Sequence, residues 1–168
     1  MKRFSIIIFK HNIKLSSIIF LCLTGIVALF FLINSLLSGT DSGNVSGGIV
    51  ELIKSLFFPN LDYEGTIILT TVIRKLAHFT EFGIFMGFFN CFMLSITEYK
   101  NKAYIFLTLF LALLCPMLDE SVQYFSPGRT PSVADAWVDF GGELCGILVS
   151  TFIYTFISKK YRKRLKNT

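Results

Sequence analysis

The chain has 168 residues, of which 16% are charged, and its mean hydropathy is +0.63. Soluble domains have about 25% charged residues, so the composition excludes an ordinary soluble protein and predicts a single integral membrane domain over residues 1–168. The net charge of +5 does not indicate nucleic-acid binding, because the basic residues flank apolar runs and do not alternate with stacking aromatic residues.

Four apolar runs are long enough to cross the hydrocarbon core of a bilayer, which is about 30 Å thick. The first, residues 15–37, follows a basic segment and is too long for the apolar region of a signal peptide, so it predicts an uncleaved signal anchor. The others cover about residues 76–96, 103–118 and 140–157. The expected fold is therefore all-α, a four-transmembrane-helix bundle.

The segment between the first two runs is rich in Gly and Ser over residues 39–48 and reads IVELIKSLFF over residues 49–58. In a helix, Val50, Ile53 and Phe57 would form an apolar face opposite Glu51 and Lys54. This pattern favours a short helix in the membrane interface between spans 1 and 2. A poorly ordered loop is the alternative.

The distribution of basic residues predicts the orientation, because Lys and Arg are retained on the cytoplasmic side. Twelve of the sixteen lie in the N-terminal segment, at residues 100–102 and at residues 159–166. We therefore expect a multi-pass protein of the plasma membrane with both termini in the cytoplasm. Its remaining polar residues would cluster on the extracytoplasmic side.

The first stretch of ionisable residues lies at the start of the second run. Charged side chains cost roughly 2.5–3.5 kcal/mol each to insert into a membrane, so they need partners or a function. Arg74, His78 and Glu81 are spaced to share one helix face, and Lys75 lies next to that face.

The second stretch follows the third run. Asp119, Glu120 and Gln123 fall within one helical turn if the helix continues past residue 118. Pro116 would kink this helix without necessarily ending it.

The third stretch begins with a Pro/Gly-rich turn over residues 126–131, which carries Arg129. Ser132 is then a candidate N-cap, with Asp135 in the position of a capping box. Asp135, Asp139 and Glu143 recur every four residues and would form one acidic stripe that requires facing cations. The small residues beside this stripe, which would let another helix approach closely, are Gly141, Gly142 and Gly146.

The four cysteines, Cys22, Cys91, Cys115 and Cys145, lie singly in apolar stretches and lack the paired spacing of a zinc or redox site. We interpret them as small core residues. Cys115 and Cys145 could lie close enough to pair, and the sequence leaves this open.

These polar motifs together resemble the VanZ-like membrane proteins over roughly residues 74–146. The matching motifs are Lys75-x-x-His78-Phe79-x-Glu81-Phe82, Asp119-Glu120-x-x-Gln123, Pro127-Gly128-Arg129-Thr130 and Asp135-x-x-x-Asp139-x-x-Gly142-x-x-x-Gly146. Arg74 and Asp139 stand where this family often has Asp and usually has Asn, respectively. The resemblance implies an envelope protein associated with resistance to glycopeptides, especially teicoplanin, and supplies no reaction.

The first functional hypothesis is an outer-leaflet polar pocket that binds a lipid-linked envelope intermediate or an amphiphilic glycopeptide. Arg74, Lys75 and Arg129 would receive its phosphate or carboxylate groups. Membrane lipid is a further expected partner, and nucleic acid is not. The expected ligand-binding residues are Arg74, Lys75, His78, Glu81, Glu120, Gln123, Arg129, Asp135 and Asp139.

The second hypothesis is a membrane-embedded hydrolase or transferase. His78 would be a general base oriented by Glu81, and Asp119, Glu120 and Asp135 would supply an acid or ligate a divalent metal. One histidine is few for zinc and no nucleophile motif occurs, so the sequence assigns no metal site and leaves any cofactor unknown. The third hypothesis is a structural charge network at the helix ends, without a ligand.

Overall fold

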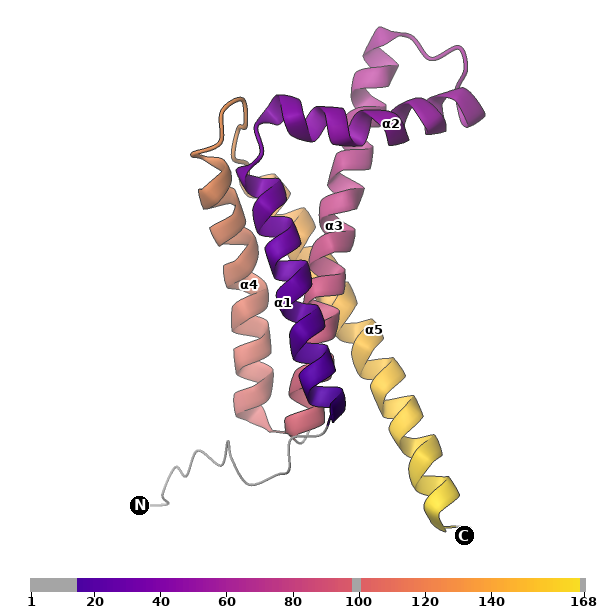
Figure 1. Cartoon of the computed structure of the whole chain (residues 1–168), viewed down its shortest axis with the longest axis vertical. Coiled ribbons are helices and arrows are strands. Elements are labelled where there is room, and N and C mark those ends of the chain that lie inside the picture. Colours follow the sequence, from indigo (N-terminus) through magenta and orange to yellow (C-terminus); the bar gives the residue numbers. More distant parts are fainter. Residues whose placement is uncertain (1–14, 98–100, 167–168) are drawn as a thin grey trace.

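The computed structural model describes residues 15–97 and 101–166 of the chain. Over these residues the fold is all-helical, with five α-helices and no strand. The helices are α1 (Leu15–Leu36), α2 (Gly39–Phe57), α3 (Tyr63–Ile96), α4 (Lys102–Gln123) and α5 (Val133–Lys166). In Figure 1, α1, α3, α4 and α5 form a bundle and α2 lies across one end of it, which we name the α2 end.

Four helices are long and apolar enough to cross a membrane: α1, α3, α4 and the Val133–Ile157 part of α5. Large apolar side chains point outward from them, and Phe106 and Phe152 are each 72% exposed. Such a surface suits contact with lipid, where helices satisfy their own backbone hydrogen bonds. The predicted all-α fold with four spans is therefore confirmed, and the orientation of the termini stays a prediction.

Two of these helices begin earlier than the apolar runs predicted. α3 starts at Tyr63 instead of near residue 76, because the Asp62 side chain caps it by accepting a hydrogen bond of 2.8 Å from the Gly65 amide. α5 starts at Val133, directly after the predicted N-cap Ser132, although its apolar run begins only near residue 140. The apolar runs mark only the hydrocarbon-compatible part of each helix, and charged or polar turns extend it.

α4 continues through Pro116 to Gln123, five residues beyond the apolar run that ended at residue 118. The predicted helical extension of the third span is thus confirmed. It places Asp119, Glu120 and Gln123 in the last turns of α4, all of them buried.

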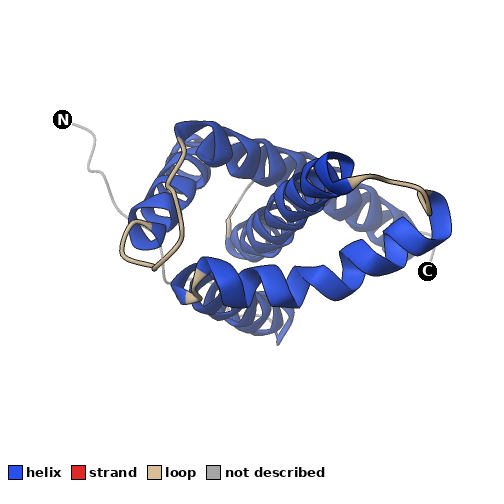
Figure 2. Ribbon diagram, turned by 90° about the horizontal axis from the view of Figure 1, so that it is seen from above, coloured by secondary structure: helices blue, strands red, loops and turns tan. Residues whose placement is uncertain are grey.

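The segment between the first two spans forms α2, which begins at Gly39 and so includes the Gly/Ser-rich part of the sequence. Seen from above in Figure 2, α2 runs across the end of the bundle to a loop from which α3 returns. Val50 is buried, as predicted for the apolar face, whereas Phe57 at the end of that face is 70% exposed. The predicted short helix is therefore present and longer than expected.

α3 and α5 make the most extensive helix contact of the bundle, and glycines bring their backbones together. A Cβ built on Gly142 would collide with the backbone carbonyl of Phe79, and one on Gly146 with that of Gly83. The predicted close approach beside the acidic stripe is confirmed for these two glycines, and the partner helix is α3. At Gly141, by contrast, a Cβ would make an ordinary contact of 3.6 Å with the Phe79 ring.

A second polar network joins three helices at the end of the bundle opposite α2. Asn90, which is fully buried in α3, donates to Ser150 Oγ and Thr151 Oγ1 of α5, each at 2.8 Å. The Tyr104 hydroxyl of α4 donates to Asn90 Oδ1. Buried amides need such partners, so this network fixes the relative position of the three helices.

α1 attaches to α3 through both aromatic and polar contacts. Phe31 stacks on Phe82 with ring centroids 5.0 Å apart and meets the edge of Phe85 at 5.3 Å. Near the N-terminal end of α1, Ser95 Oγ of α3 donates to Ser17 Oγ at 2.7 Å. These contacts place the C-terminal end of α1 over the polar turns of α3.

The cysteines lie apart in the fold as free thiols. Cys22 and Cys145 are exposed, and Cys91 and Cys115 are partly buried. The possible Cys115–Cys145 pair is not formed in the structure. The interpretation as small core residues is wrong for Cys22 and Cys145, whose side chains face outward from their helices.

Candidate functional site

The three predicted stretches of ionisable residues meet inside the bundle near the α2 end. α3 supplies the first stretch, the last turns of α4 the second, and the α4–α5 turn with the start of α5 the third. The glycine contact between Phe79 and Gly142 lies immediately beside His78 and Asp139 in sequence. Close helix packing therefore determines how near these side chains come to each other.

Lys75 of α3 and Asp135 of α5 form an ion pair at the edge of the site. The Lys75 Nζ to Asp135 Oδ1 distance is 2.5 Å, and the side chains are 41% and 26% exposed. Solvent-accessible pairs of this kind contribute about 0–1 kcal/mol to stability. The pair consequently does more to position the two helices and neutralise Asp135 than to stabilise the fold.

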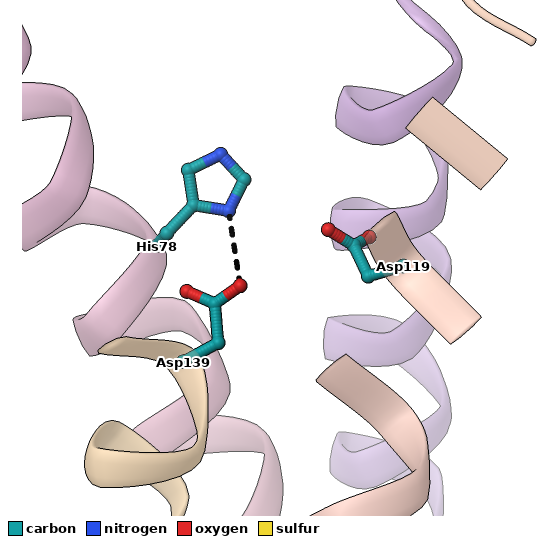
Figure 3. Close-up of side chains that lie close together, drawn as sticks. All are labelled: His78, Asp119 and Asp139. Atoms are coloured by element: carbon teal, nitrogen blue, oxygen red, sulfur yellow. Dashed lines mark ion pairs between the residues drawn. The ribbon is translucent and has the colours of Figure 1, made fainter. Parts of the chain in front are cut away.

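Deeper in the bundle, His78 faces two buried carboxylates (Figure 3). Its Nδ1 lies 3.9 Å from Asp139 Oδ2, and the His78 and Asp139 side chains are 18% and 1% exposed. Asp119 points toward the pair from α4, so that one ligand atom from each of the three residues lies within 4.8 Å of the others. Asp139, and not the predicted Glu81, is thus the carboxylate nearest to the imidazole.

Asp119 is held by two hydrogen bonds. The Ser35 hydroxyl of α1 donates to its Oδ1, and Gln123 Nε2 donates to its Oδ2 at 2.7 Å. The second bond is the i, i+4 contact that the sequence predicted. The first brings α1 into the site, which the sequence did not predict.

Glu120 caps α5 from the neighbouring helix. Its Oε2 accepts a hydrogen bond of 2.7 Å from the backbone amide of Ser132, the residue before α5. In a capping box this amide is bound from within the same helix, and Asp135 was predicted to do so. The predicted acceptor was wrong, because Asp135 pairs with Lys75 and the Glu120 carboxylate accepts the bond from Ser132 instead.

Glu81 turns toward α1. Asn34 Nδ2 donates to Glu81 Oε1 at 3.4 Å. Because Glu81 bonds to Asn34 of α1, and Asp139 is the carboxylate nearest to His78, Glu81 does not orient His78 as predicted.

Arg129 closes the end of α1 from the α4–α5 turn. Gly128 next to it has a φ of 74°, which the Pro-Gly turn predicted. Arg129 Nη2 donates to the Asn34 carbonyl at 2.8 Å, and the Ser126 hydroxyl donates to the Ser35 carbonyl at 2.7 Å. The Asn34 carbonyl also accepts a bond of 3.3 Å from the Leu37 amide, and the bond from Ser126 supplies a partner at the helix end, where intrahelical donors run out.

The rest of the Arg129 guanidinium is buried, and its Nε and Nη1 have no hydrogen-bond partner within the described part of the chain. Burial lowers the pKa of Arg129, and the nearby positive charge of Arg74 lowers it further. Guanidinium groups stay charged in proteins. Arg129 therefore presents a positive charge with two donor groups still available.

Of the acidic stripe of α5 (Asp135, Asp139 and Glu143), only the first residue pairs closely with a cation in the part of the chain that the structure describes. Asp135 meets Lys75, and Asp139 faces His78 at a distance longer than a hydrogen bond. The carboxyl oxygens of Asp139 and Glu143 are buried and have no hydrogen-bond partner among the described residues. The prediction that cations would face the whole stripe was wrong, because the available cations reach only its first turn.

A small pocket opens among these groups, with room inside for little more than one water molecule. Its lining residues are Arg74, Lys75, His78, Glu120, Gln123, Asp135, Val138 and Asp139. Seven of the nine predicted ligand-binding residues therefore share one pocket, and Glu81 and Arg129 lie beside it. The contributions of Asn34, Ser35 and Ser126 were not predicted. Asn34 and Ser35 are adjacent polar residues near the end of an apolar span, and this pattern could have indicated a contact with the polar site.

The comparisons with known proteins agree with the motifs. A match to the VanZ/LLP1 family covers residues 18–154, which include all the residues of this site. No curated protein and no solved structure matches the chain. The family match spans most of the sequence and all four membrane-crossing helices, and the chain belongs to the VanZ/LLP1 family.

Proposed function

We propose that this VanZ/LLP1 protein binds the anionic group of a lipid-linked or amphiphilic ligand at the outer leaflet of the plasma membrane. Through this binding it contributes to resistance to glycopeptides such as teicoplanin. The observation that carries the proposal is the buried guanidinium of Arg129, whose Nε and Nη1 have no hydrogen-bond partner among the described residues. The oxygens of a phosphate or carboxylate would supply charge-assisted acceptors for these two N–H groups.

Two further cations support an anionic ligand. Arg74 and Lys75 line the pocket, and Arg74 is close enough to lower the pKa of Arg129. Like charges repel, so an anion placed between Arg74 and Arg129 is attracted by both, and Lys75, which is paired with Asp135, adds a weaker attraction. The pocket interior is too small for a whole lipid head group, and the ligand would therefore offer a single anionic group at its mouth.

An apolar pocket on the neighbouring face of α4 and α5 supports a ligand that also carries a hydrocarbon chain. Its lining residues are Leu113, Pro116, Met117, Val133, Ala136, Trp137 and Phe140. None of them is charged, and Trp137 and Val133 are 62% and 79% exposed. An amphiphile would place its chain against this face and its anionic group near the Arg129 turn.

Binding of farnesyl phosphate tests the proposal, because this probe combines a phosphate with an apolar chain. Calorimetric titration of the protein in phosphatidylcholine nanodiscs, corrected with empty nanodiscs, gives the affinity. Farnesol and inorganic phosphate tested alone separate the contributions of chain and phosphate. We expect both to bind at least tenfold more weakly than farnesyl phosphate.

Substitutions of the cations locate the binding. Hydrogen bonds to charged groups contribute about 1.5–3 kcal/mol, so Arg129→Gln should weaken binding by about tenfold or more. Arg74→Gln, at an exposed side chain, should weaken it with no effect on folding, and Lys54→Gln on α2 is the matched control. Equal affinity in Arg129→Gln, Arg74→Gln and Lys54→Gln would contradict the proposal.

The resistance role is tested in cells that express each variant. We expect Arg129→Gln to restore teicoplanin susceptibility while the protein stays in the membrane at its normal abundance. If each site variant instead disappears from the membrane, the residues form a structural charge network. Unchanged resistance at normal abundance would contradict the proposed role.

A membrane-embedded hydrolase or transferase is the second candidate function. It is favoured by the buried carboxylate of Asp139 next to His78, since a carboxylate beside a histidine orients an acid–base catalyst. Incubation of the protein with farnesyl phosphate, with and without a chelator, should then release phosphate. An unchanged mass of the probe would exclude this reaction for this class of substrate.

A further inference from the structure

Three helices bring one histidine and two carboxylates together in the interior of the site. His78 comes from α3, Asp119 from α4 and Asp139 from α5, and a ligand atom of each lies within 4.8 Å of the other two (Figure 3). Asp119 and Asp139 are each 1% exposed. The sequence assigned no metal site, because one histidine is few for zinc, and the enzyme hypothesis named only Asp119, Glu120 and Asp135 as possible ligands of a divalent metal.

The strongest sign of a missing ligand is Asp139. Both of its carboxyl oxygens are buried and have no hydrogen-bond partner among the described residues. The His78 Nδ1 atom, at 3.9 Å, is too distant for a hydrogen bond. A buried carboxylate without partners is strongly unfavourable unless it takes up a proton or a cation meets it, and a metal ion competes with the proton for the same oxygens.

The basic side chains of the site do not fill this role. Lys75 Nζ is bound to Asp135, and Arg129 Nη2 is bound to the Asn34 carbonyl. Arg129 Nε and Nη1 and both oxygens of Asp139 have no hydrogen-bond partner among the described residues, so Arg129 and Asp139 are not bonded to each other. The carboxylate therefore remains open to a cation from outside the chain.

We propose that His78, Asp119 and Asp139 bind one divalent transition-metal ion, of the Zn²⁺ or Mn²⁺ class. The mixed donor set selects this class, because imidazole suits zinc and carboxylates suit manganese as well as zinc. Three protein ligands leave at least one coordination position open, as in catalytic metal sites. Two of the three ligands, His78 and Asp139, line the small pocket, where a water molecule could occupy such a position.

The geometry requires only a modest contraction. Ligand atoms around a tetrahedral metal at about 2.1 Å lie roughly 3.4 Å apart, so the cluster must close by at most roughly 1.5 Å. Side-chain rotation supplies movements of this size. Asp119 is already oriented by Ser35 and Gln123, in the way that outer hydrogen bonds orient metal ligands.

Metal binding is measured on the full chain in phosphatidylcholine nanodiscs without any lipid ligand. After dialysis against a chelator and its removal, the protein is titrated with ZnCl₂ and with MnCl₂ in a calorimeter. We expect one equivalent of at least one of these metals to bind. A lack of saturable binding of both metals by the unaltered protein would overturn the proposal.

Asp139→Asn keeps the size of the side chain and should weaken binding by at least about tenfold. Glu64→Gln is the control, because it removes an exposed carboxylate of α3 that lies outside the site, and its affinity should stay within about threefold of the unaltered protein. Equal affinity in Asp139→Asn and Glu64→Gln would show binding elsewhere and overturn the site.

A spectroscopic measurement on the unaltered protein does not depend on how well the variants fold. Bound Co²⁺ should give visible absorption bands of a low-symmetry site, and Zn²⁺ should displace it with one-to-one stoichiometry. Bands typical of hexaaqua Co²⁺ alone would contradict the site. Because these tests use neither farnesyl phosphate nor teicoplanin, the metal site and the proposed ligand function can fail separately.

Discussion

Alanine at Gly142 should disrupt the contact on which the site geometry depends. The new Cβ would collide with the Phe79 carbonyl, which belongs to the backbone of α3 and cannot turn aside. Overpacking of this kind costs about 1–3 kcal/mol, and higher helix propensity of Ala offsets up to about 1 kcal/mol. We expect a net loss of about 1–2 kcal/mol in the free energy of unfolding and a wider separation of His78 from Asp139.

Neighbouring glycines provide the controls for this substitution. A Cβ on Gly141 would meet only the Phe79 ring, at 3.6 Å, and one on Gly25 of α1 would meet nothing within 4 Å. Gly141→Ala and Gly25→Ala should therefore leave stability unchanged or raise it by up to about 1 kcal/mol. Denaturant titration of each variant in detergent micelles, followed by circular dichroism, measures the differences. A Gly142→Ala protein as stable as Gly141→Ala would refute the backbone contact between α3 and α5.

Two further substitutions test buried polar groups, and both are measured by the same denaturant titration. Asn90→Leu should lower the free energy of unfolding by about 1–3 kcal/mol. It removes the side chain to which the hydroxyls of Tyr104, Ser150 and Thr151 are hydrogen-bonded. An unchanged stability would contradict a structural role of this network. Glu143→Met should leave stability unchanged or raise it by up to about 4 kcal/mol, because the buried carboxyl group has no hydrogen-bond partner to lose among the residues that the structure describes. A clear destabilisation would show that Glu143 has a partner.

The fold was largely predictable because membrane spans depend on length and hydropathy alone. The errors in the predicted helix boundaries lie at the ends of helices, where capping residues and not apolar residues determine where a helix begins or stops. Asp62 begins α3 well before the apolar run, and the Gly/Ser-rich segment after Gly39 is helical although its composition favours a loop. Tertiary contacts and caps determine these boundaries, and hydropathy does not record them.

The members of the site were predictable, but their pairing was not. Helical periodicity placed His78 and Glu81 on one face, and the order of the spans required the three stretches to meet. Which carboxylate faces the histidine depends on the rotation of α5 against α3, which the glycine contacts fix. The contribution of α1 through Asn34 and Ser35 was missed because both residues are uncharged and lie inside the run over residues 15–37, so they were counted only as part of that span.

The account depends most on the position of the Arg129 turn outside the cell, where an envelope ligand can reach it. In a variant whose native cysteines are replaced by serine, Pro127→Cys on this turn and Asn101→Cys before α4 each give one exposed thiol. The account predicts that a membrane-impermeant maleimide labels Pro127→Cys in intact cells and labels Asn101→Cys only after permeabilisation. Labelling of Asn101→Cys in intact cells, with Pro127→Cys protected until the membrane is opened, would contradict it.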